Sequence, residues 1–264
     1  MNRRAVVMTH HKTGTKWMEL TFGGIASELG LRCHRMPGKG QHTLDVSAPC
    51  ILMDRQSRWF RRPPEWLAST PDDRFLHLIR DPRDVVISGM YFHCRASEGW
   101  LHVPRDEFGG MTYQEKINSF SDDRSRLLFE MDNRAAGTIQ RMVAWDYGRP
   151  ECFECRYEDL VEDTSTSQFT KILLHLGFAN EELETCRQQF WKLALFSRSS
   201  DTENGLHVRS GRKQQWQEIF DQSLGLEFLQ RFPDALTRLG YEQDTTWVNA
   251  TRPDSQTGLL AADA

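Results

Sequence analysis

Short apolar segments of strand length alternate with longer amphipathic segments along most of the chain. The pairs of segments, in order, are Ala5–Met8 and Trp17–Leu29, Cys50–Met53 and Pro63–Ala68, Phe75–Ile79 and Asp84–Phe92, and Cys152–Arg156 and Ser167–Leu176. Such alternation is typical of βαβ units, in which parallel strands form a sheet covered by helices. The pattern therefore predicts an α/β fold with three layers, α/β/α, around a central, mainly parallel sheet.

Helical periodicity continues outside these units. We expect a long helical stretch at Tyr113–Tyr147 and two further helices at Glu181–Phe196 and Ser223–Leu239. The last residues lack periodicity and are rich in Thr, Asp and small side chains, which predicts a poorly ordered tail at 244–264. Because no linker of low complexity divides the rest, we expect one domain over residues 1–243.

The composition is that of a soluble globular protein. The chain has 264 residues, of which 39% are hydrophobic and 27% charged, and its formal net charge is -4. This charge gives no global reason to expect nucleic acid or an anionic membrane as partner. No apolar run near the start reaches the roughly 20 residues of a membrane span or the apolar region of a signal peptide. We therefore expect a cytoplasmic protein, acting as a monomer or homodimer.

The six cysteines are interpreted as reduced thiols, because a chain of this size folds without disulfides. Cys152 and Cys155 form a C-x-x-C pattern, but residues three apart in an extended segment point to opposite faces. They would not converge on a metal ion. The adjacent His10 and His11 also point apart, and no third ligand follows at helical spacing. No metal site is predicted.

The residues after the first predicted strand have the composition of a phosphate-binding loop. The segment from Thr9 to Trp17 holds one glycine, two lysines and several hydroxyls, and it leads straight into a helix. Backbone N–H groups and the positive helix end favour an anion, Gly14 allows close approach, and Lys12 supplies a charge. The segment is not a Walker A loop, because Thr9 stands in place of that motif's first glycine. A strand-to-helix turn capped by a threonine is the alternative.

A second anion-binding segment follows the third predicted strand. Arg80 emerges at the carboxyl end of that strand, Pro82 pre-sets the first helical turn, and Ser88 lies two turns into the helix. Arg80 and Ser88 can therefore face one ligand. Arg83 and Asp84 are interpreted as structural, through local pairing or capping. In open α/β sheets, ligands bind beyond the carboxyl ends of the strands, where both segments lie.

Four blocks, in order, resemble the sulfotransferases that use 3′-phosphoadenosine-5′-phosphosulfate. The segment 11–17 is similar to the family's 5′-phosphosulfate loop, and 80–88 is similar to its 3′-phosphate segment. The segment 156–160 resembles a Tyr-Glu-Asp-Leu block, whose tyrosine approaches adenine. The segment 208–211, followed by Trp216, resembles a late Arg-Lys-Gly loop that closes over the 3′-phosphate. Together the blocks extend over most of the chain.

The resemblance implies a donor site. Lys12 would contact the sulfuryl group and the leaving oxygen, Trp17 would stack on adenine, and Arg80 would bind the 3′-phosphate. The implied donor-binding residues are Lys12, Thr13, Gly14, Thr15, Lys16, Trp17, Arg80, Ser88, Tyr157, Arg209, Ser210 and Gly211. The donor substrate would be 3′-phosphoadenosine-5′-phosphosulfate and the product adenosine 3′,5′-bisphosphate, with no metal required. Departures from the family are His11 in place of proline, Lys16 in place of a hydroxyl, and Ser210 in place of lysine, whose charge Lys213 could recover.

A base must take the proton of the acceptor. In the cytosolic branch of the family this is a histidine in a Lys-Thr-His strand end, whereas the comparable strand end here reads Met53-Asp54-Arg55. Burial would raise the pKa of an Asp54 carboxylate toward the working range, and Arg55 would oppose this. The rivals for the role are His10, His11, His42, His93, Glu19 and water, while His77 is interpreted as a satisfied core histidine. The candidate catalytic residues are Lys12, Asp54, His11 and Ser88.

The resemblance implies in-line transfer of a sulfuryl group to a hydroxyl of a small-molecule acceptor, such as a secondary metabolite, alcohol, phenol or sugar. Two alternatives remain: a P-loop nucleotide or small-molecule kinase, in which Asp54 would hold magnesium, and a catalytically silent nucleotide-binding module. The acceptor pocket would come from about 34–62, 93–112 and 197–207. The basic run from Arg55 to Arg62 favours a solvated loop or an acceptor-site lid over a nucleic-acid surface.

Overall fold

The chain divides into two compact units in the computed structural model. The residues that the structure describes are 1, 3–36, 45–61, 69–194 and 212–253. Unit 1 comprises Met1–Arg80 and Trp145–Gly211, and unit 2 comprises Asp81–Ala144 and Arg212–Ala264. Each unit takes two separate stretches of the chain, and the single domain expected over residues 1–243 stays a prediction.

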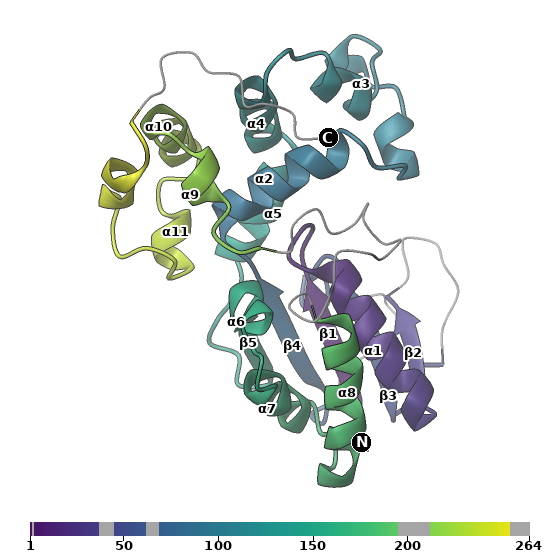
Figure 1. Ribbon diagram of the computed structural model, residues 1–264. Coiled ribbons are helices and arrows are strands. Elements are labelled where there is room, and N and C mark those ends of the chain that lie inside the picture. Colours follow the sequence, from purple (N-terminus) through teal and green to yellow (C-terminus); the bar gives the residue numbers. More distant parts are fainter. Residues whose placement is uncertain (2, 37–44, 62–68, 195–211, 254–264) are drawn as a thin grey trace. The chain divides into compact units, whose positions relative to one another are not determined.

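Unit 1 is built on a parallel sheet, drawn with its helices in Figure 1. The strands in its described residues are β1 (Arg4–Thr9), β2 (Arg32–Arg35), β3 (Cys50–Asp54), β4 (Arg74–Ile79) and β5 (Cys152–Arg156). Their order across the sheet is β2-β3-β1-β4-β5, and every neighbouring pair is parallel. The predicted α/β class with a mainly parallel sheet is therefore confirmed.

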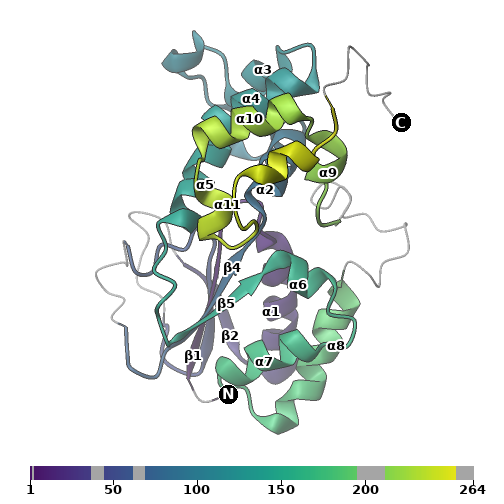
Figure 2. The same ribbon diagram turned by 90° about the vertical axis from the view of Figure 1, so that its left-hand side faces the viewer.

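Helices cover one face of this sheet, as Figure 2 shows for α1, α7 and α8. The helices in the described part of unit 1 are α1 (Thr15–Leu29), α6 (Tyr157–Val161), α7 (Ser167–His175) and α8 (Leu183–Leu193), the last preceded by a 3-10 turn (Asn180–Glu182). Aromatic side chains, among them Trp59, Phe60 and Trp145, pack against the opposite face. The helix expected at Pro63–Ala68 lies outside the described residues.

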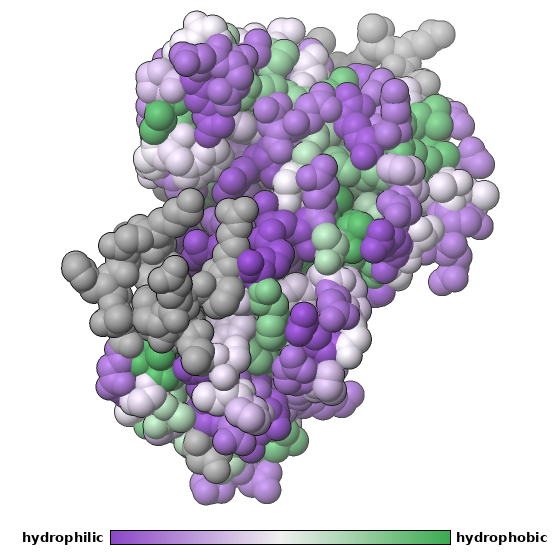
Figure 3. Space-filling view, turned by 180° about the vertical axis from the view of Figure 1, so that it is seen from behind, coloured by the Kyte–Doolittle hydropathy of each residue, from purple (hydrophilic) through white to green (hydrophobic). Residues whose placement is uncertain are grey.

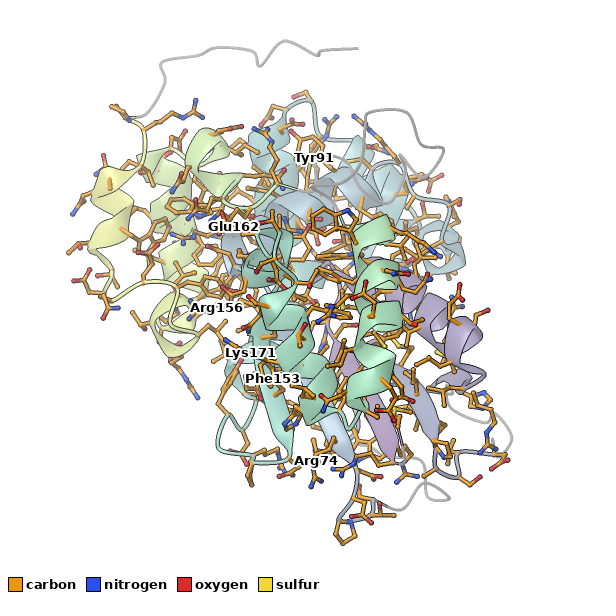
Figure 4. The ribbon with its side chains drawn as sticks, turned by 60° about the horizontal axis from the view of Figure 1, so that its bottom comes forward. Arg74, Tyr91, Phe153, Arg156, Glu162 and Lys171 are labelled. Atoms are coloured by element: carbon orange, nitrogen blue, oxygen red, sulfur yellow. The ribbon has the colours of Figure 1, made fainter. Side chains whose placement is uncertain are left out.

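Successive side chains along the strands point alternately into two apolar clusters, one on each face of the sheet, as the two-residue period of a strand requires. Cys155 packs in the cluster under the helices, and Cys152 packs on the other face. Their opposite orientation is confirmed, and all six cysteines are free thiols. Figure 4 shows Phe153 and Arg156 along β5 with Lys171 on the neighbouring α7. The Phe153 ring lies edge-on to His175, with ring centroids 5.6 Å apart.

Strand β2 was not among the predicted elements. Its sequence is Arg-Cys-His-Arg, and its side chains are only half-buried or exposed. An edge strand pairs through its backbone on one side only and needs no apolar alternation, so its sequence lacks the signal that marks a central strand.

Unit 2 is helical in its described residues. Its first helix, α2, begins at Pro82 directly after Asp81, whose carboxylate accepts a hydrogen bond from the Arg83 N–H at 2.9 Å. The α-helices are α2 (Pro82–His93), α3 (Tyr113–Asn118), α4 (Asp123–Asp132), α5 (Arg134–Val143), α9 (Trp216–Ile219), α10 (Gln222–Arg231) and α11 (Ala235–Arg238), and the 3-10 helices are Gly99–His102, Asp106–Phe108 and Thr246–Ala250.

Two of the predicted helices are interrupted. The stretch expected at Tyr113–Tyr147 forms α3, α4 and α5, because Asp122 caps a new helix by accepting from the Ser125 N–H, and the backbone turns again at Asn133. The helix expected at Ser223–Leu239 is split into α10 and α11, since Pro233 lacks the N–H that would continue α10.

Part of the expected tail is ordered. Trp247 and Val248 are buried in the 3-10 helix Thr246–Ala250, while 254–264 lie outside the described residues. Trp247 and Trp216 both pack against Arg83. The Arg83 guanidinium lies 3.5 Å from the Trp216 ring centroid and 4.6 Å from the Trp247 ring centroid. Arg83 also pairs with Asp81 and Glu242. These contacts account for the structural interpretation of Arg83.

No helix in the described ranges is both long and apolar enough to cross a membrane. The large hydrophobic side chains exposed there come from separate segments: Val103, Tyr147, Leu174, Trp191 and Leu226. On the face drawn in Figure 3, hydrophobic residues are interspersed with hydrophilic ones.

Candidate functional site

The order of the strands reverses at β1, which places a ligand-binding position at the carboxyl ends of β1 and β4. Strands β3 and β2 lie to one side of β1, and β4 and β5 lie to the other. Ligands of open α/β sheets bind at such switch points. The loop from His10 to Gly14 follows β1, and Arg80 follows β4. Both predicted anion-binding segments therefore begin at this point of unit 1.

The loop after β1 is closed on itself by its own hydroxyl groups. The Oγ1 atoms of Thr13 and Thr15 donate to the His10 carbonyl at 3.0 and 2.9 Å, and the His10 N–H donates to Thr13 Oγ1 at 2.9 Å. Thr9 Oγ1 lies 2.9 Å from Thr15 Oγ1. Lys12 has a φ of 67°, in the left-handed region, which a residue other than glycine rarely adopts. Hydrogen bonds on both sides of Lys12 thus hold a strained backbone.

Helix α1 starts without a side-chain cap, so the alternative of a turn capped by a threonine is wrong. Gly14 occupies the cap position with a φ of 100°, and no side chain accepts from the first turn. The first helical bond runs from the Met18 N–H to the Gly14 carbonyl. The N–H groups of Thr15, Lys16 and Trp17 come before this bond, so they have no intrahelical acceptor. Such a turn provides the N–H groups that bind a phosphate or sulfate.

Arg80 and Tyr157 pack directly on this loop. The Arg80 guanidinium lies 4.4 Å from the centroid of the Tyr157 ring, and its Nη1 donates to the Lys12 carbonyl at 3.3 Å. A Cβ atom placed on Gly14 would be 3.1 Å from Tyr157 Cδ2. The structure therefore brings together, within unit 1, residues that the sequence separates by as much as 145 positions (157 − 12).

Trp17 is more enclosed than an adenine-stacking role suggests. Its side chain is 5% exposed. Its ring stacks on Phe190 with centroids 5.4 Å apart and meets Tyr157 edge-on at 5.9 Å. Stacking of Trp17 on adenine stays a prediction.

The other predicted donor-binding residues are placed as follows. Lys16 is exposed on the first turn of α1. Ser88 is half-buried on α2, in unit 2. Arg209, Ser210 and Gly211 lie outside the described residues, as does His42.

Asp54 is fully buried and is occupied by backbone hydrogen bonds. Its Oδ2 accepts from the N–H groups of Arg58 at 2.5 Å and Trp59 at 2.8 Å, and its Oδ1 accepts from that of Gln56 at 3.2 Å. Burial raises the pKa of this carboxyl, and the hydrogen bonds from Trp59, Gln56 and Arg58 oppose that rise. Both oxygens thus hold the turn after β3, and this geometry favours a structural role for Asp54 over the predicted role of base.

The rival bases differ in their surroundings. The Glu19 carboxylate pairs with Arg35 at 3.0 Å and Arg55 at 3.3 Å, so two cations neutralise it. His93 is buried in unit 2, where its Nδ1 lies 2.8 Å from Glu130 Oε2. His11 is half-buried in the loop.

His10 begins a buried chain of hydrogen-bonded side chains. Its Nε2 lies 2.8 Å from His77 Nε2, and His77 Nδ1 lies 2.5 Å from Glu154 Oε2. Trp145 stacks on His77 with ring centroids 3.9 Å apart, and its Nε1–H donates to Glu154 Oε1 at 2.7 Å. The interpretation of His77 as a satisfied core histidine is confirmed. Glu154 was not among the predicted site residues, although a carboxylate within an apolar strand was a signal in the sequence.

No group of three or more His, Cys, Asp or Glu side chains is placed to hold a metal ion, as far as the described residues extend.

Comparisons with known proteins identify the fold. Neither family models nor curated proteins match the chain. Among solved structures, mouse sulfotransferase SULT7A1 complexed with PAP superposes with a TM-score of 0.59 at 12% identity, covering 94% of this chain and 87% of that one. Retinol dehydratase with androsterone and the inactive cofactor PAP gives 0.57 at 14% identity, covering 88% and 80%. Its complex with retinol and PAP gives 0.53 at 17%, covering 88% and 81%. The chain has the fold of these proteins.

Proposed function

We propose that this chain transfers a sulfuryl group from 3′-phosphoadenosine-5′-phosphosulfate to a hydroxyl of a small molecule. The observation that carries the proposal is the cluster in unit 1 formed by the loop after β1, Arg80 and Tyr157. It combines N–H groups at a helix start with a buried guanidinium, which suits a ligand that carries phosphate and sulfate. Proteins of the same fold have been solved with PAP bound, which supports the same ligand class here.

The transfer needs positioned positive charge. The acceptor oxygen forms a bond to sulfur while the bond from sulfur to the phosphate oxygen breaks, so negative charge develops on the leaving phosphate. Lys12 would stabilise that charge from the loop, and the amides at the start of α1 would hold the 5′-phosphate. Arg80 would bind the 3′-phosphate from unit 1, and Ser88, Arg209, Ser210 and Gly211 are added from the sequence resemblance alone. Tyr157 would approach the adenine.

The acceptor is proposed to be a small hydroxyl-bearing molecule, since a similar structure holds androsterone and another holds retinol. We also propose that the chain acts in the cytoplasm, as a monomer or homodimer. Its cysteines form no disulfide, which suits a reducing compartment.

Lys12→Ala tests the proposed function. Turnover of labelled donor should fall by about 100-fold or more, because the developing charge loses its cation, while affinity for adenosine 3′,5′-bisphosphate should fall much less. Calorimetry measures that affinity. Lys171→Ala, which removes an exposed lysine from α7, is the matched control and should leave both quantities unchanged.

A chelator separates the proposal from a kinase. A kinase needs magnesium at its phosphates, so its turnover would stop in the presence of EDTA. Sulfuryl transfer by this chain should continue under the same conditions. If the wild-type chain fails to bind adenosine 3′,5′-bisphosphate, the proposed function is wrong.

A further inference from the structure

We propose that His10, His77 and Glu154 form a proton relay that takes the proton from the acceptor hydroxyl. The inference rests on the proposed sulfuryl transfer, which releases one proton for every group transferred. It assigns the base to His10, two residues before Lys12, makes His77 the group that receives the His10 Nε2 proton, and makes Glu154 the residue that positions His77. The three side chains come from β4, β5 and the loop after β1, all within unit 1.

The hydrogen bonds allow one arrangement of protons when both imidazoles are neutral. An ionised carboxylate only accepts, so the proton between His77 Nδ1 and Glu154 Oε2 belongs to His77. His77 Nε2 then accepts, and the proton between the two imidazoles belongs to His10 Nε2. The nitrogen of His10 without a proton is consequently Nδ1, which can act as a base.

The relay moves the positive charge away from the acceptor to His77, beside the Glu154 carboxylate. When His10 Nδ1 takes the proton of the acceptor hydroxyl, directly or through one water, the proton on His10 Nε2 passes to His77 Nε2. His77 is then an imidazolium between the Glu154 carboxylate and the His10 lone pair, with Trp145 stacked on its ring. The acceptor oxygen, now without its proton, forms the bond to sulfur as the phosphate oxygen leaves. When the product has left, the proton on His77 Nε2 returns to His10 Nε2 while the proton on His10 Nδ1 passes to water, which restores the starting arrangement for the next turnover.

The position of His10 is set by the loop that would bind the donor. Its carbonyl accepts from the Thr13 N–H, Thr13 Oγ1 and Thr15 Oγ1, and its N–H donates to Thr13 Oγ1, so four hydrogen bonds hold its backbone. The imidazole is 1% exposed in the chain without substrates. Catalytic hydrogen bonds often tighten only when substrates bind.

Other titratable groups also face the relay. The alternation of the strands puts Asp54 on the same sheet face, and the Tyr147 ring centroid lies 5.9 Å from that of His77.

Glu154→Gln tests this arrangement because Trp145 dictates how the new amide must lie. The Trp145 Nε1–H needs an acceptor, so the amide oxygen should take the place of Oε1 and the amide nitrogen that of Oε2. The nitrogen then donates to His77 Nδ1, and both imidazoles reverse their protons. His10 is left with a proton on Nδ1 and can no longer accept one. The variant keeps all these hydrogen bonds, but its reversed proton arrangement prevents His10 from acting as the base.

Removing the indole N–H should reverse the defect. In the double variant Trp145→Phe with Glu154→Gln, the amide is free to present its oxygen to His77 and restore the original protons. Turnover should fall by about 100-fold in Glu154→Gln and recover at least about 10-fold in the double variant. In Glu154→Gln, the fall of turnover at low pH that reports protonation of the base should no longer match that of the wild type. Affinity for adenosine 3′,5′-bisphosphate should be unchanged in both.

Glu151→Gln is the matched control. It makes the same chemical change at the residue just before β5, where the carboxylate is 32% exposed and pairs with Arg149. It should leave turnover as in the wild type. If Glu154 has only a structural role, Glu154→Gln should lower the melting temperature without a separate effect on turnover. Adding Trp145→Phe should then lower the melting temperature further and should not restore turnover.

The outcomes separate the relay from the proposed function. If the wild type transfers sulfuryl groups and Glu154→Gln does so with an unchanged rate profile, the relay is wrong and the function stands. Nitrogen-15 NMR of the wild type reads the imidazole protons without any variant. A proton on His10 Nδ1 would overturn the relay even if Glu154→Gln fails to fold.

Discussion

The ring of Tyr157 lies against Gly14, and a Cβ atom at that glycine would be 3.1 Å from Tyr157 Cδ2 and 3.4 Å from Leu78 Cδ2. Gly14 also has a φ of 100°, which L side chains rarely adopt. Space and backbone conformation therefore both require glycine at the start of α1. Tyr157, which follows β5 and begins α6, is consequently packed directly against the loop after β1.

Gly14→Ala should destabilise the chain by about 1–3 kcal/mol and weaken binding of adenosine 3′,5′-bisphosphate, because the loop must move to admit the methyl group. Denaturant unfolding and calorimetry measure the two effects. Gly30→Ala is the control: Gly30 also has a positive φ, 64°, but nothing lies within 4 Å of its Cβ position. It should lower stability and spare affinity. Equal affinity in the two variants would show that the contact with Tyr157 has no bearing on the ligand.

Arg80→Ala should weaken binding of adenosine 3′,5′-bisphosphate by roughly 2–4 kcal/mol, because a phosphate would lose a charged two-point contact. Arg80→Lys should recover only part of this, since an ammonium cannot make the planar contact or stack on Tyr157 in the same way. Calorimetry gives both affinities. Arg74→Ala removes an arginine from the opposite end of the same strand, visible in Figure 4, and should change nothing. Unchanged affinity in Arg80→Ala would remove Arg80 from the donor site.

Asp54→Asn should lower stability by about 1–3 kcal/mol, because the amide nitrogen cannot accept from the backbone N–H groups that both carboxylate oxygens now serve. Turnover per folded molecule should change little. The exposed Asp72→Asn is the control for both measurements. A loss of turnover of about 100-fold without a loss of stability would instead make Asp54 the base.

The same variant has a pH signature. Burial raises the pKa of Asp54 in the folded chain above the ordinary 3.8, so the folded chain holds this proton more tightly than the unfolded one. The stability that this carboxyl contributes is therefore present below 3.8 and is lost as pH rises through its folded pKa. Asp54→Asn lacks that loss. The gap in stability between wild type and variant should thus be wider at about pH 4 than at about pH 7, and a gap that widens with pH would contradict the direction of the shift.

The cysteines should be unreactive in the folded chain. Burial raises the pKa of the Cys33 and Cys94 thiols to about 11 and of the Cys152 and Cys186 thiols to about 12. Only the thiolate is nucleophilic, so alkylation by iodoacetamide near neutral pH should be slow until the chain unfolds. Mass spectrometry of the alkylated peptides measures this. Rapid labelling of any of these four in the folded chain would contradict the prediction.

The fold class and the loop were readable in the sequence because their signals are local. A central strand buried on both sides needs a continuous apolar run, and a phosphate-binding turn needs its glycine and lysines within a few residues, so Ala5–Met8 and Lys12 stand out together. Arg80 stands out in the same way, directly after an apolar strand. The edge strand β2 was not predicted because such a strand needs no apolar alternation. The breaks between helices were not predicted because capping side chains override a continuous helical period.

Only the tertiary structure decided what the polar residues on this sheet do. Asp54 ends β3 and His10 follows β1, and the sequence alone cannot tell which of them acts as the base. Parallel pairing of β1, β4 and β5 brings His77 to His10 across 67 positions and Glu154 to His77 across 77. The turn at 54–59 meanwhile closes its N–H groups around Asp54. Hydrogen bonds depend on distance and angle in space, and strand register, which no local pattern records, determines both.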